Sequence, residues 1–495
     1  MRRDWLTAVT VGIVLAGNLV APPPAFASTP QASNPAAAPG AMAEAFDAYM
    51  KAAVETGHFS GTVLVARNGV PLFQGNYGLA SIELNVPIRD DTVYDVQSIT
   101  KPFTALLIMM LQEEGKLSVT DRACDYLADC PEAWRPITIE HLLTHTSGIE
   151  GYSRLDDWDE TLDSRTYSRA GAASLVRNRP LRFAPGEGWR YSNSGYQLLA
   201  QIVERVSGKT LPEMYRERIF SPLGMNHSGF SNSRLVVPNQ ATGYYSLGSI
   251  FIRAAPESVT SNFGNGGIVS TAGDLLMWDQ ALYSNRLISR ASYEQMIAHT
   301  KNDYGYGWEI RNWSRRRQIG HAGSGGGYST QIARFIDDGL TVVVLSNSDA
   351  ASGGGTAQAL AAIYFGEDHR TPALSSEAML LDAIIANGVD AGIQRYRDMK
   401  AAQPSAEAFQ NDELLVSVGY ELHGVPSMDE ARRIFEFALQ EFPRSAYSYD
   451  GLADIAAAEG DQDAAIRHFE TSLAFDPTNE YAVKGLERVR AARPE

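Results

Sequence analysis

The stretch Ser98-Ile99-Thr100-Lys101-Pro102-Phe103 organises the rest of this chain. Proline is tolerated only in the opening turn of a helix, so Pro102 indicates that a helix begins close to Ser98. The run from Phe103 to Leu111 is apolar on most faces, which predicts a helix that is buried on most sides. We therefore expect Ser98 at the start of a buried helix.

Ser98 and Lys101 are three residues apart, so they share one face of this helix. An ammonium group in apolar surroundings loses solvation, which lowers the lysine pKa and lets Lys101 accept the serine proton. The backbone N–H of Ser98, at the positive end of the helix, can stabilise an oxyanion. The S-x-x-K pattern also occurs by chance in long chains, so it needs support from other residues.

A second pattern lies in the turn-rich loop 185–193, which precedes a predicted amphipathic helix at 195–206. Tyr191 and Asn193 alternate along this loop, so an extended backbone would point both side chains the same way. Tyr-x-Asn is common in isolation and proves nothing by itself.

A third pattern, His321-Ala322-Gly323, ends a predicted strand and leads into a glycine-rich turn at 324–327. Glycine permits close approach of another backbone, so a substrate could lie along this strand and hydrogen-bond to it. A lone histidine in such a place is more often structural than functional.

Strand patterns concentrate after residue 300, and Asn68-Gly69 and Asp338-Gly339 are typical hairpin turns. A helix is predicted at 42–56. The predicted strands, which we expect to pair in an antiparallel sheet, are 61–66, 70–77, 304–310, 318–322, 328–335 and 340–345.

Taken together in chain order, the three patterns at Ser98, Tyr191 and His321 resemble the penicillin-recognising serine hydrolases. The resemblance is to the class C β-lactamase group with its DD-carboxypeptidases, D-aminopeptidases and esterases. The stretch Leu-Leu-Thr-His-Thr-Ser-Gly at 142–148 is similar to that family too, and the resemblance covers about residues 42–365. It implies an α+β fold, in which an antiparallel sheet is flanked by helices and a helical subdomain lies alongside.

The resemblance also implies three catalytic roles. Ser98 would be the acylated nucleophile, and Lys101 would lower the proton affinity around it. Tyr191 would be the general base, either as a phenolate or as a proton relay held by Lys101.

Four further positions would bind the substrate by the same resemblance. Asn193 would bind a substrate amide, His321 and Gly323 would contact the substrate, and the backbone N–H groups of Ser98 and Ser324 would form the oxyanion hole. The β-lactamases of this group carry Lys-Thr-Gly where this chain has His-Ala-Gly at 321–323. Because a neutral imidazole attracts a carboxylate less than an ammonium does, efficient β-lactam hydrolysis is in doubt.

The net charge of the chain limits which classes of partner it can bind. The formal net charge of −16 and a pI near 5.1 argue against nucleic acid and against anionic membrane surfaces. No cofactor or metal is implied, because His141 and His145, four residues apart, have no evident third ligand. We expect a structural role for these two histidines.

The N-terminus has the features of an export signal. Arg2 and Arg3 precede an apolar stretch at 6–20 that is too short to span a bilayer, and Ala25-Phe26-Ala27 is a small-x-small cleavage signal. We expect a signal peptide at 1–27, a periplasmic or secreted protein, and no membrane span in the mature chain. An uncleaved anchor is the alternative, and the paired arginines leave general and twin-arginine export both open.

Two cysteines, Cys124 and Cys130, are present in the whole chain. An exported protein with two nearby cysteines is expected to pair them in a disulfide. The alternative is a pair of free buried thiols.

The chain divides into a leader at 28–41, a hydrolase domain at 42–367, a linker at 368–376 and a helical domain at 377–495. In the last of these, Pro443 and Pro477 are 34 residues apart, and Phe435 and Phe469 share this spacing. The period resembles tetratricopeptide repeats and predicts an all-α repeat domain. Such an array either holds a protein or peptide partner or packs as a structural cap.

Three functional hypotheses remain at this point. The first is an exported serine hydrolase that forms an acyl-enzyme on Ser98 and acts on D-amino-acid peptides or small esters. The second is a β-lactamase with the same chemistry. The third is a non-catalytic, penicillin-binding-like sensor or scaffold that works through its helical repeats.

Overall fold

A computed structural model describes residues 40–57, 59–155, 172–231, 236–255, 262–298, 301–423 and 428–492. The predicted signal peptide and nearly all of the predicted leader lie outside these residues. The described residues form two compact units, each with its own hydrophobic core. The larger unit comprises 40–245 and 252–373, and the smaller comprises 246–251 and 374–492.

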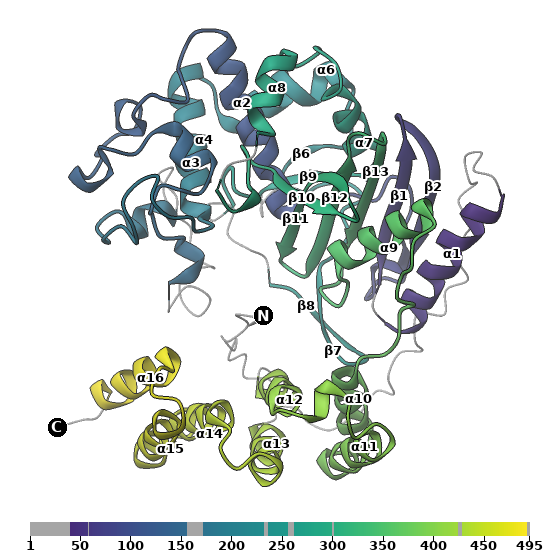
Figure 1. The fold of residues 1–495 in the computed structure, drawn as a ribbon, viewed down its shortest axis with the longest axis vertical. Coiled ribbons are helices and arrows are strands. Elements are labelled where there is room, and N and C mark those ends of the chain that lie inside the picture. Colours follow the sequence, from purple (N-terminus) through teal and green to yellow (C-terminus); the bar gives the residue numbers. More distant parts are fainter. Residues whose placement is uncertain are drawn as a thin grey trace. The chain divides into compact units, whose positions relative to one another are not determined.

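The larger unit is built on a six-stranded antiparallel sheet with the order β10-β11-β12-β13-β1-β2 (Figure 1). The first strands of the chain therefore pair with the last, since β1 lies next to β13. This architecture confirms the predicted α+β fold with an antiparallel sheet. The strands are β1 (Gly61–Arg67), β2 (Val70–Tyr77), β10 (Glu309–Trp313), β11 (Arg316–Gly325), β12 (Tyr328–Phe335) and β13 (Leu340–Ser346).

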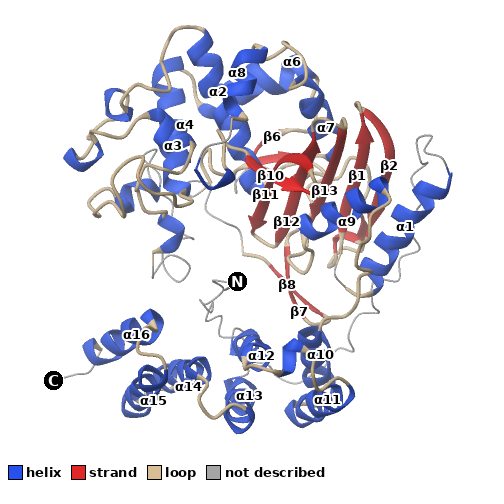
Figure 2. Ribbon diagram, in the orientation of Figure 1, coloured by secondary structure: helices blue, strands red, loops and turns tan. Residues whose placement is uncertain are grey.

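Helices cover both faces of this sheet (Figure 2). In β1, Val63 and Val65 enter the core beneath α1 (Gly40–Glu55) and α9 (Gly353–Phe365). The alternate residues Leu64 and Ala66 enter the opposite core, with α2 (Thr100–Glu113) and α7 (Ala272–Ala281). Because successive side chains of a strand point to opposite faces, a strand buried on both sides reads as an unbroken apolar run.

A helical region joins the α2 side of the sheet, and α4 (Asn193–Ser207) packs directly against α2. A small sheet of β5 (Tyr94–Asp95), β9 (Ile268–Ser270) and β6 (Gly229–Phe230) leads the chain into α2, and these strands were not predicted. The remaining helices and short strands of the unit are α3 (Ile139–Leu143), α5 (Leu211–Tyr215), α6 (Ser221–Leu223), α8 (Arg290–Met296), β3 (Leu79–Ser81), β4 (Val86–Pro87), β7 (Tyr244–Leu247) and β8 (Ile250–Arg253), the last two of which extend into the smaller unit.

The predicted strand at 304–310 is wrong in most of its length. β10 begins only at Glu309, and Tyr304–Trp308 forms a turn in which the Gly305 N–H donates to the Trp308 carbonyl oxygen at 2.8 Å. Gly307 has a φ of +77°, and a Cβ there would lie 2.9 Å from the Lys101 carbonyl oxygen. The glycines therefore let this turn wrap around the start of α2, where a straight strand would clash.

Cys124 and Cys130 form a disulfide bond in the structure. It closes a short loop in the helical region of the larger unit.

The smaller unit consists of paired helices. The starts of α13 and α15 are 34 residues apart, as are those of α14 and α16. Gly451 and Gly485 show the same spacing, and each lies against a phenylalanine ring, Phe435 and Phe469 respectively. The helices are α10 (Ser376–Asn387), α11 (Val389–Ala402), α12 (Glu413–His423), α13 (Met428–Glu441), α14 (Ala446–Ala458), α15 (Gln462–Phe475) and α16 (Glu480–Ala491).

Residues 246–251, the tip of the β7–β8 hairpin, belong to this smaller unit. Leu247 is buried with Leu380 and Leu381, and the Ser249 N–H donates to Asp382 Oδ1 at 2.6 Å. Sequence patterns gave no sign that this hairpin contributes to the helical unit. Among the described residues of both units, none of the helices has the length and hydropathy needed to span a bilayer.

Candidate active site

Ser98 lies in a 3-10 turn, Gln97–Ile99, immediately before α2. Gln97 has a φ of +52°, a left-handed backbone conformation that residues other than glycine rarely adopt. Its N–H donates to Asp95 Oδ1 at 2.9 Å, which holds the turn in place. Such strained residues cluster at functional sites, where surrounding structure maintains them.

Lys101 lies three residues after Ser98, about one helical turn further along, and its side chain is completely buried. Its Nζ lies 2.9 Å from Ser98 Oγ and 2.8 Å from the Asn265 carbonyl oxygen. In the described part of the chain, no carboxylate forms an ion pair with it. Burial lowers the Lys101 pKa well below its usual value, so the neutral amine is favoured and can accept a proton.

Asn265, which receives the Lys101 hydrogen bond through its backbone, is itself held on both sides. Its Nδ2 donates to the Tyr152 hydroxyl at 2.8 Å, and its Oδ1 accepts from the Phe263 N–H at 3.1 Å. Sequence reasoning missed Asn265 because a backbone acceptor leaves no side-chain signal.

Tyr191 completes the group around Ser98. Its ring lies 4.7 Å from Lys101 Nζ, and its hydroxyl hydrogen-bonds to the Ser98 side chain. Burial raises the Tyr191 pKa above its usual value, although the Ser98 hydrogen bond partly offsets this effect. With the lysine pKa lowered and the tyrosine pKa raised, the neutral pair is favoured. The surroundings thus favour a proton relay over a standing phenolate.

His321 is held as a neutral imidazole. Its Nδ1 lies 2.6 Å from the Ala322 carbonyl oxygen, which can only accept, so Nδ1 carries the proton. Its Nε2 therefore accepts from the Tyr304 hydroxyl, 3.0 Å away. Burial, together with the nearby Lys101, lowers the His321 pKa to about 3, so this residue offers no positive charge at neutral pH.

Gly323 brings β11 against the segment that precedes Ser98. A Cβ at this position would lie 2.3 Å from the Val96 carbonyl oxygen, so no larger residue fits. The pairing of β11 with β10 ends at Gly320, so one edge of residues 321–325 has no neighbouring strand among the described residues. Ser324, the predicted oxyanion-hole residue, lies on this free stretch.

Asn193 is the first residue of α4, not part of an extended loop as predicted. Its Nδ2 donates to Ser153 Oγ at 3.1 Å. Its Oδ1 is buried and has no hydrogen-bond partner among the described residues, so it remains available as an acceptor.

The structure thus brings Ser98, Lys101 and Tyr191 into direct contact. It places His321 beside them, with its ring 6.2 Å from that of Tyr191. Sequence reasoning missed Tyr304, which bonds to His321; the glycines of Tyr304-Gly-Tyr-Gly-Trp308 signal a turn that a strand prediction overlooks.

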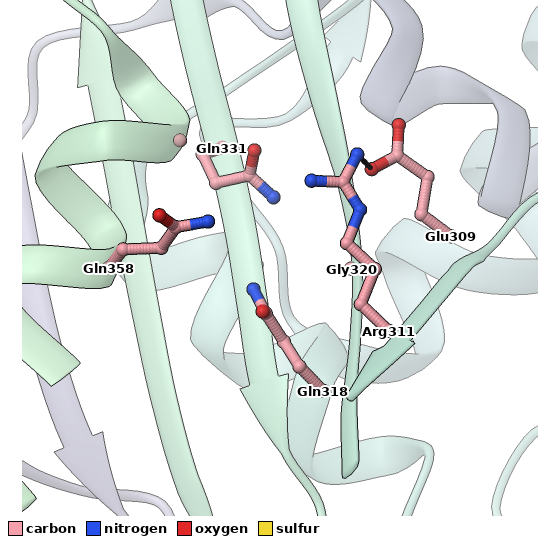
Figure 3. A pocket seen from close by; sticks show the side chains of 7 residues that line it. Glu309, Arg311, Gln318, Gly320, Gln331 and Gln358 are labelled. Carbon is pink, nitrogen blue, oxygen red and sulfur yellow. Dashed lines mark ion pairs between the residues drawn. The ribbon is translucent and has the colours of Figure 1, made fainter. Parts of the chain in front are cut away.

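A small polar cavity lies elsewhere on the sheet (Figure 3). Its volume is about 20 Å³, and Gln318, Gln331 and Gln358 line it together with the ion pair between Arg311 and Glu309. Because alternate strand residues point to opposite faces, Gln318 points away from the face that carries His321. The cavity has room for about one water molecule and none for a peptide or ester.

The described part of the chain contains no group of three or more His, Cys, Asp or Glu side chains that could hold a metal ion. His141 Nδ1 instead accepts from the Thr138 N–H at 3.2 Å and helps to cap α3. His145 lies next to the Ser98 group.

Residues 44–365 match the family profile described as Beta-lactamase. This chain belongs to the β-lactamase family. The match ends before the helical unit, for which no repeat family is identified.

Several members of the family are similar to this chain. Penicillin-binding protein 4* of Bacillus subtilis is 34% identical over 318 residues, which cover 60% of this chain and 69% of that protein. The D-aminopeptidase of Brucella anthropi is 26% identical over 59% of this chain and 56% of its own length. Esterase EstB of Burkholderia gladioli is 35% identical over 40% of this chain and 54% of its own length.

Two solved structures are similar to this chain as well. The octameric penicillin-binding protein homologue from Pyrococcus abyssi has a TM-score of 0.58 and 28% identity, over 66% of this chain and 78% of that one. The D-stereospecific amidohydrolase from a Streptomyces species has a TM-score of 0.55 and 25% identity, over 66% of this chain and 99% of that one. The chain is thus a β-lactamase-family protein related to penicillin-binding proteins, D-aminopeptidases and esterases.

Proposed function

We propose that this protein is an exported serine hydrolase that forms an acyl-enzyme on Ser98 and acts on D-amino-acid peptides or small esters. The observation that carries the proposal is the buried Lys101 amine, 2.9 Å from Ser98 Oγ and without a carboxylate partner among the described residues. A buried lysine with no counter-ion is costly to a protein, and proton transfer is a reason to keep one.

The proposed reaction uses these groups in sequence. Ser98 Oγ attacks the substrate carbonyl carbon while its proton passes to Lys101, directly or through the Tyr191 hydroxyl. The oxyanion is stabilised by the backbone N–H of Ser98 and that of Ser324. The proton then moves to the leaving amine or alcohol, and the acyl-enzyme forms. Water then attacks the acyl-enzyme ester while Lys101, directly or through the Tyr191 hydroxyl, takes one of its protons. The bond between the acyl carbon and Ser98 Oγ breaks, the proton passes to Ser98 Oγ, and the carboxylic acid leaves.

One feature makes β-lactams less favourable substrates, and a second suits substrates that carry an amide N–H. His321 is neutral, so it binds a substrate carboxylate less strongly than the lysine of the β-lactamases does. The free Oδ1 of Asn193 suits the N–H of a peptide substrate. The names of the relatives, which include a D-aminopeptidase, an esterase and a D-stereospecific amidohydrolase, agree with these substrate classes.

The decisive experiment is intact mass spectrometry of the purified protein after incubation with a fluorophosphonate, with Ser98→Ala as the control. We expect an adduct on the wild-type protein that the control lacks, followed by turnover in a panel of D-peptides and esters. A parallel incubation with a penicillin separates the branches, because rapid turnover would identify a β-lactamase. No adduct with either reagent would overturn the proposal and favour a sensor that works through the helical unit.

A further inference from the structure

His145 belongs to the aromatic group around Tyr191, and the proposed reaction assigns it no role. It is 1% exposed, and its ring lies 4.4 Å from the ring of Tyr191 and 4.6 Å from that of Tyr304. The ring of Tyr196 is 5.2 Å away. The imidazole thus fills the space behind the proposed relay tyrosine.

His145 makes hydrogen bonds to both neighbours of Tyr191. Its carbonyl oxygen accepts from the Arg190 N–H at 3.0 Å, and its Nδ1 accepts from the Ser192 N–H at 3.1 Å. These two bonds flank Tyr191 on either side. Because the backbone is held on both sides of Tyr191, it has little freedom to rotate. The position and direction from which the Tyr191 side chain extends are therefore fixed.

The tautomer of His145 follows from the same bonds. Because a backbone N–H donates to Nδ1, the ring proton must be on Nε2. Nε2 is buried and has no hydrogen-bond partner among the described residues. Leaving a buried donor without a partner is unfavourable, so the retention of an imidazole here calls for a compensating role.

The backbone of His145 is unusual as well. Its φ is +60°, a left-handed conformation, and this aims the ring at Ser192 while the carbonyl oxygen meets Arg190. A second contact supports the same loop, since the buried Glu150 carboxylate forms ion pairs with Arg182 and Arg190. The segment 145–150 therefore contacts the Tyr191 loop through the two hydrogen bonds of His145 and the ion pair between Glu150 and Arg190.

We infer that His145 is a positioning residue, whose neutral Nδ1 and carbonyl oxygen fix the Tyr191 backbone so that the hydroxyl reaches Ser98. This inference rests on the proposed function, because it assigns Tyr191 to the proton relay. His145 touches no reacting atom and needs no change of charge. Its role depends on a hydrogen-bond acceptor at the Nδ1 position, which distinguishes it from an aromatic residue that only fills space.

Three substitutions separate the acceptor from the backbone and from the ring. In His145→Asn, the Oδ1 atom can occupy the Nδ1 position, and asparagine tolerates a positive φ. In His145→Gly, the backbone is accommodated and the acceptor is lost. In His145→Gln, the amide lies near the Nε2 position, so it cannot reach the Ser192 N–H. His141→Leu is a matched control, because it also removes an imidazole that accepts a backbone N–H, here that of Thr138 and not that of a neighbour of Tyr191.

The readout is the second-order rate constant for fluorophosphonate labelling of Ser98 in proteins with unaltered circular dichroism. We expect His145→Asn and His141→Leu to stay within about threefold of the wild-type rate, and His145→Gly and His145→Gln to lose about thirtyfold or more. Wild-type labelling in both the Gly and the Gln variants would overturn the inference. Equal loss in the Asn and Gly variants would also overturn it, because the acceptor would then not matter.

A crystal structure of His145→Gln keeps this inference separate from the proposed function. If the wild-type protein is not labelled, the hydrolase proposal fails. The crystal structure of the variant still decides whether His145 positions Tyr191. We expect the Tyr191 hydroxyl to move by roughly 1 Å or more, a displacement large enough to impair catalysis. A Tyr191 side chain in its wild-type position would overturn the inference that His145 positions it.

Discussion

Lys101 and Arg334 are two fully buried cationic residues in the same unit, and their surroundings are opposite. Lys101 Nζ hydrogen-bonds to a hydroxyl and a backbone carbonyl and lies near the ring of Tyr191, with no carboxylate partner among the described residues. The guanidinium of Arg334 bonds to the Asp279 carboxylate and, at 2.5 Å, to the Tyr293 hydroxyl, and it lies over the ring of Trp308. One buried cation thus lacks a counter-ion and the other is fully paired.

The pKa values of the two groups diverge for this reason. Burial lowers the Lys101 pKa, and nothing opposes it. Burial would also lower the Arg334 pKa, but Tyr293 and Asp279 beside it raise the pKa above its usual value. A paired buried cation stays charged and serves the fold, whereas an unpaired one loses its proton readily and suits acid–base chemistry.

Replacing Lys101 gives the largest expected effect of any change to this pair. Lys101→Met should slow fluorophosphonate labelling of Ser98 by about ten-thousandfold, because the proton acceptor is gone. The same variant should unfold at an equal or higher temperature, since no amine is buried any more. The gain should be greatest at acidic pH and should vanish above pH 10.5, where the unfolded lysine is neutral too.

Lys101→Arg is the control for charge. A guanidinium keeps the positive charge and does not release its proton, so labelling should stay as slow as in Lys101→Met. Labelling of the arginine variant at the wild-type rate would contradict a proton-accepting role for Lys101.

Breaking the paired cation should affect stability and spare the chemistry. Arg334→Met leaves the Asp279 carboxylate buried without its partner, and we expect a loss of about 3–5 kcal/mol in the free energy of unfolding. Labelling of the protein that remains folded should be unchanged. Thermal unfolding and labelling of the same samples measure both quantities.

The double variant Arg334→Met/Asp279→Leu tests the reason for that loss. Since it removes both charges, it should recover much of the stability lost in Arg334→Met. If the double variant is as unstable as the single one, packing of the arginine over Trp308 and Tyr283 matters more than its charge.

The contrast between these residues also shows what a sequence can predict. The periodicity of α2 and the position of Pro102 place Ser98 and Lys101 on one face of a buried helix, because these contacts are local in the chain. The antiparallel sheet was predicted for a similar reason: its hairpin turns and apolar runs are local patterns. The apolar helix alone predicts that Lys101 loses solvation and favours its neutral form.

Contacts between distant segments are harder to predict. Arg334 and Asp279 are 55 residues apart, and nothing in the sequence around either one names the other. Asn265 acts through a backbone carbonyl, and Tyr304 reaches the site only because two glycines bend the chain around α2. Sequence patterns report the local conformation of such residues and leave their partners open.

A buried acid next to the nucleophile offers a third case, between the two cations. Asp95 is 8% exposed and accepts from the Gln97 N–H, and no cation pairs with it among the described residues. Burial raises its pKa from 3.8 to about 6, and the Gln97 hydrogen bond only partly opposes this. The Asp95 carboxyl therefore stays neutral in the folded protein up to about pH 6 and is ionised above it.

The sign of the pH dependence follows from that shift. Below pH 3.8 the carboxyl is protonated in the folded and unfolded states alike, so it carries no penalty. Between 3.8 and about 6 the unfolded carboxyl ionises first, and stability is lost until the folded group ionises too. Asp95→Asn keeps the acceptor for Gln97 and cannot ionise, so its advantage over wild type should grow by about 3 kcal/mol between acidic pH and pH 8. Thermal unfolding of both proteins across this range measures the difference, and a constant difference would mean that the Asp95 carboxyl ionises at the same pH in the folded and unfolded states.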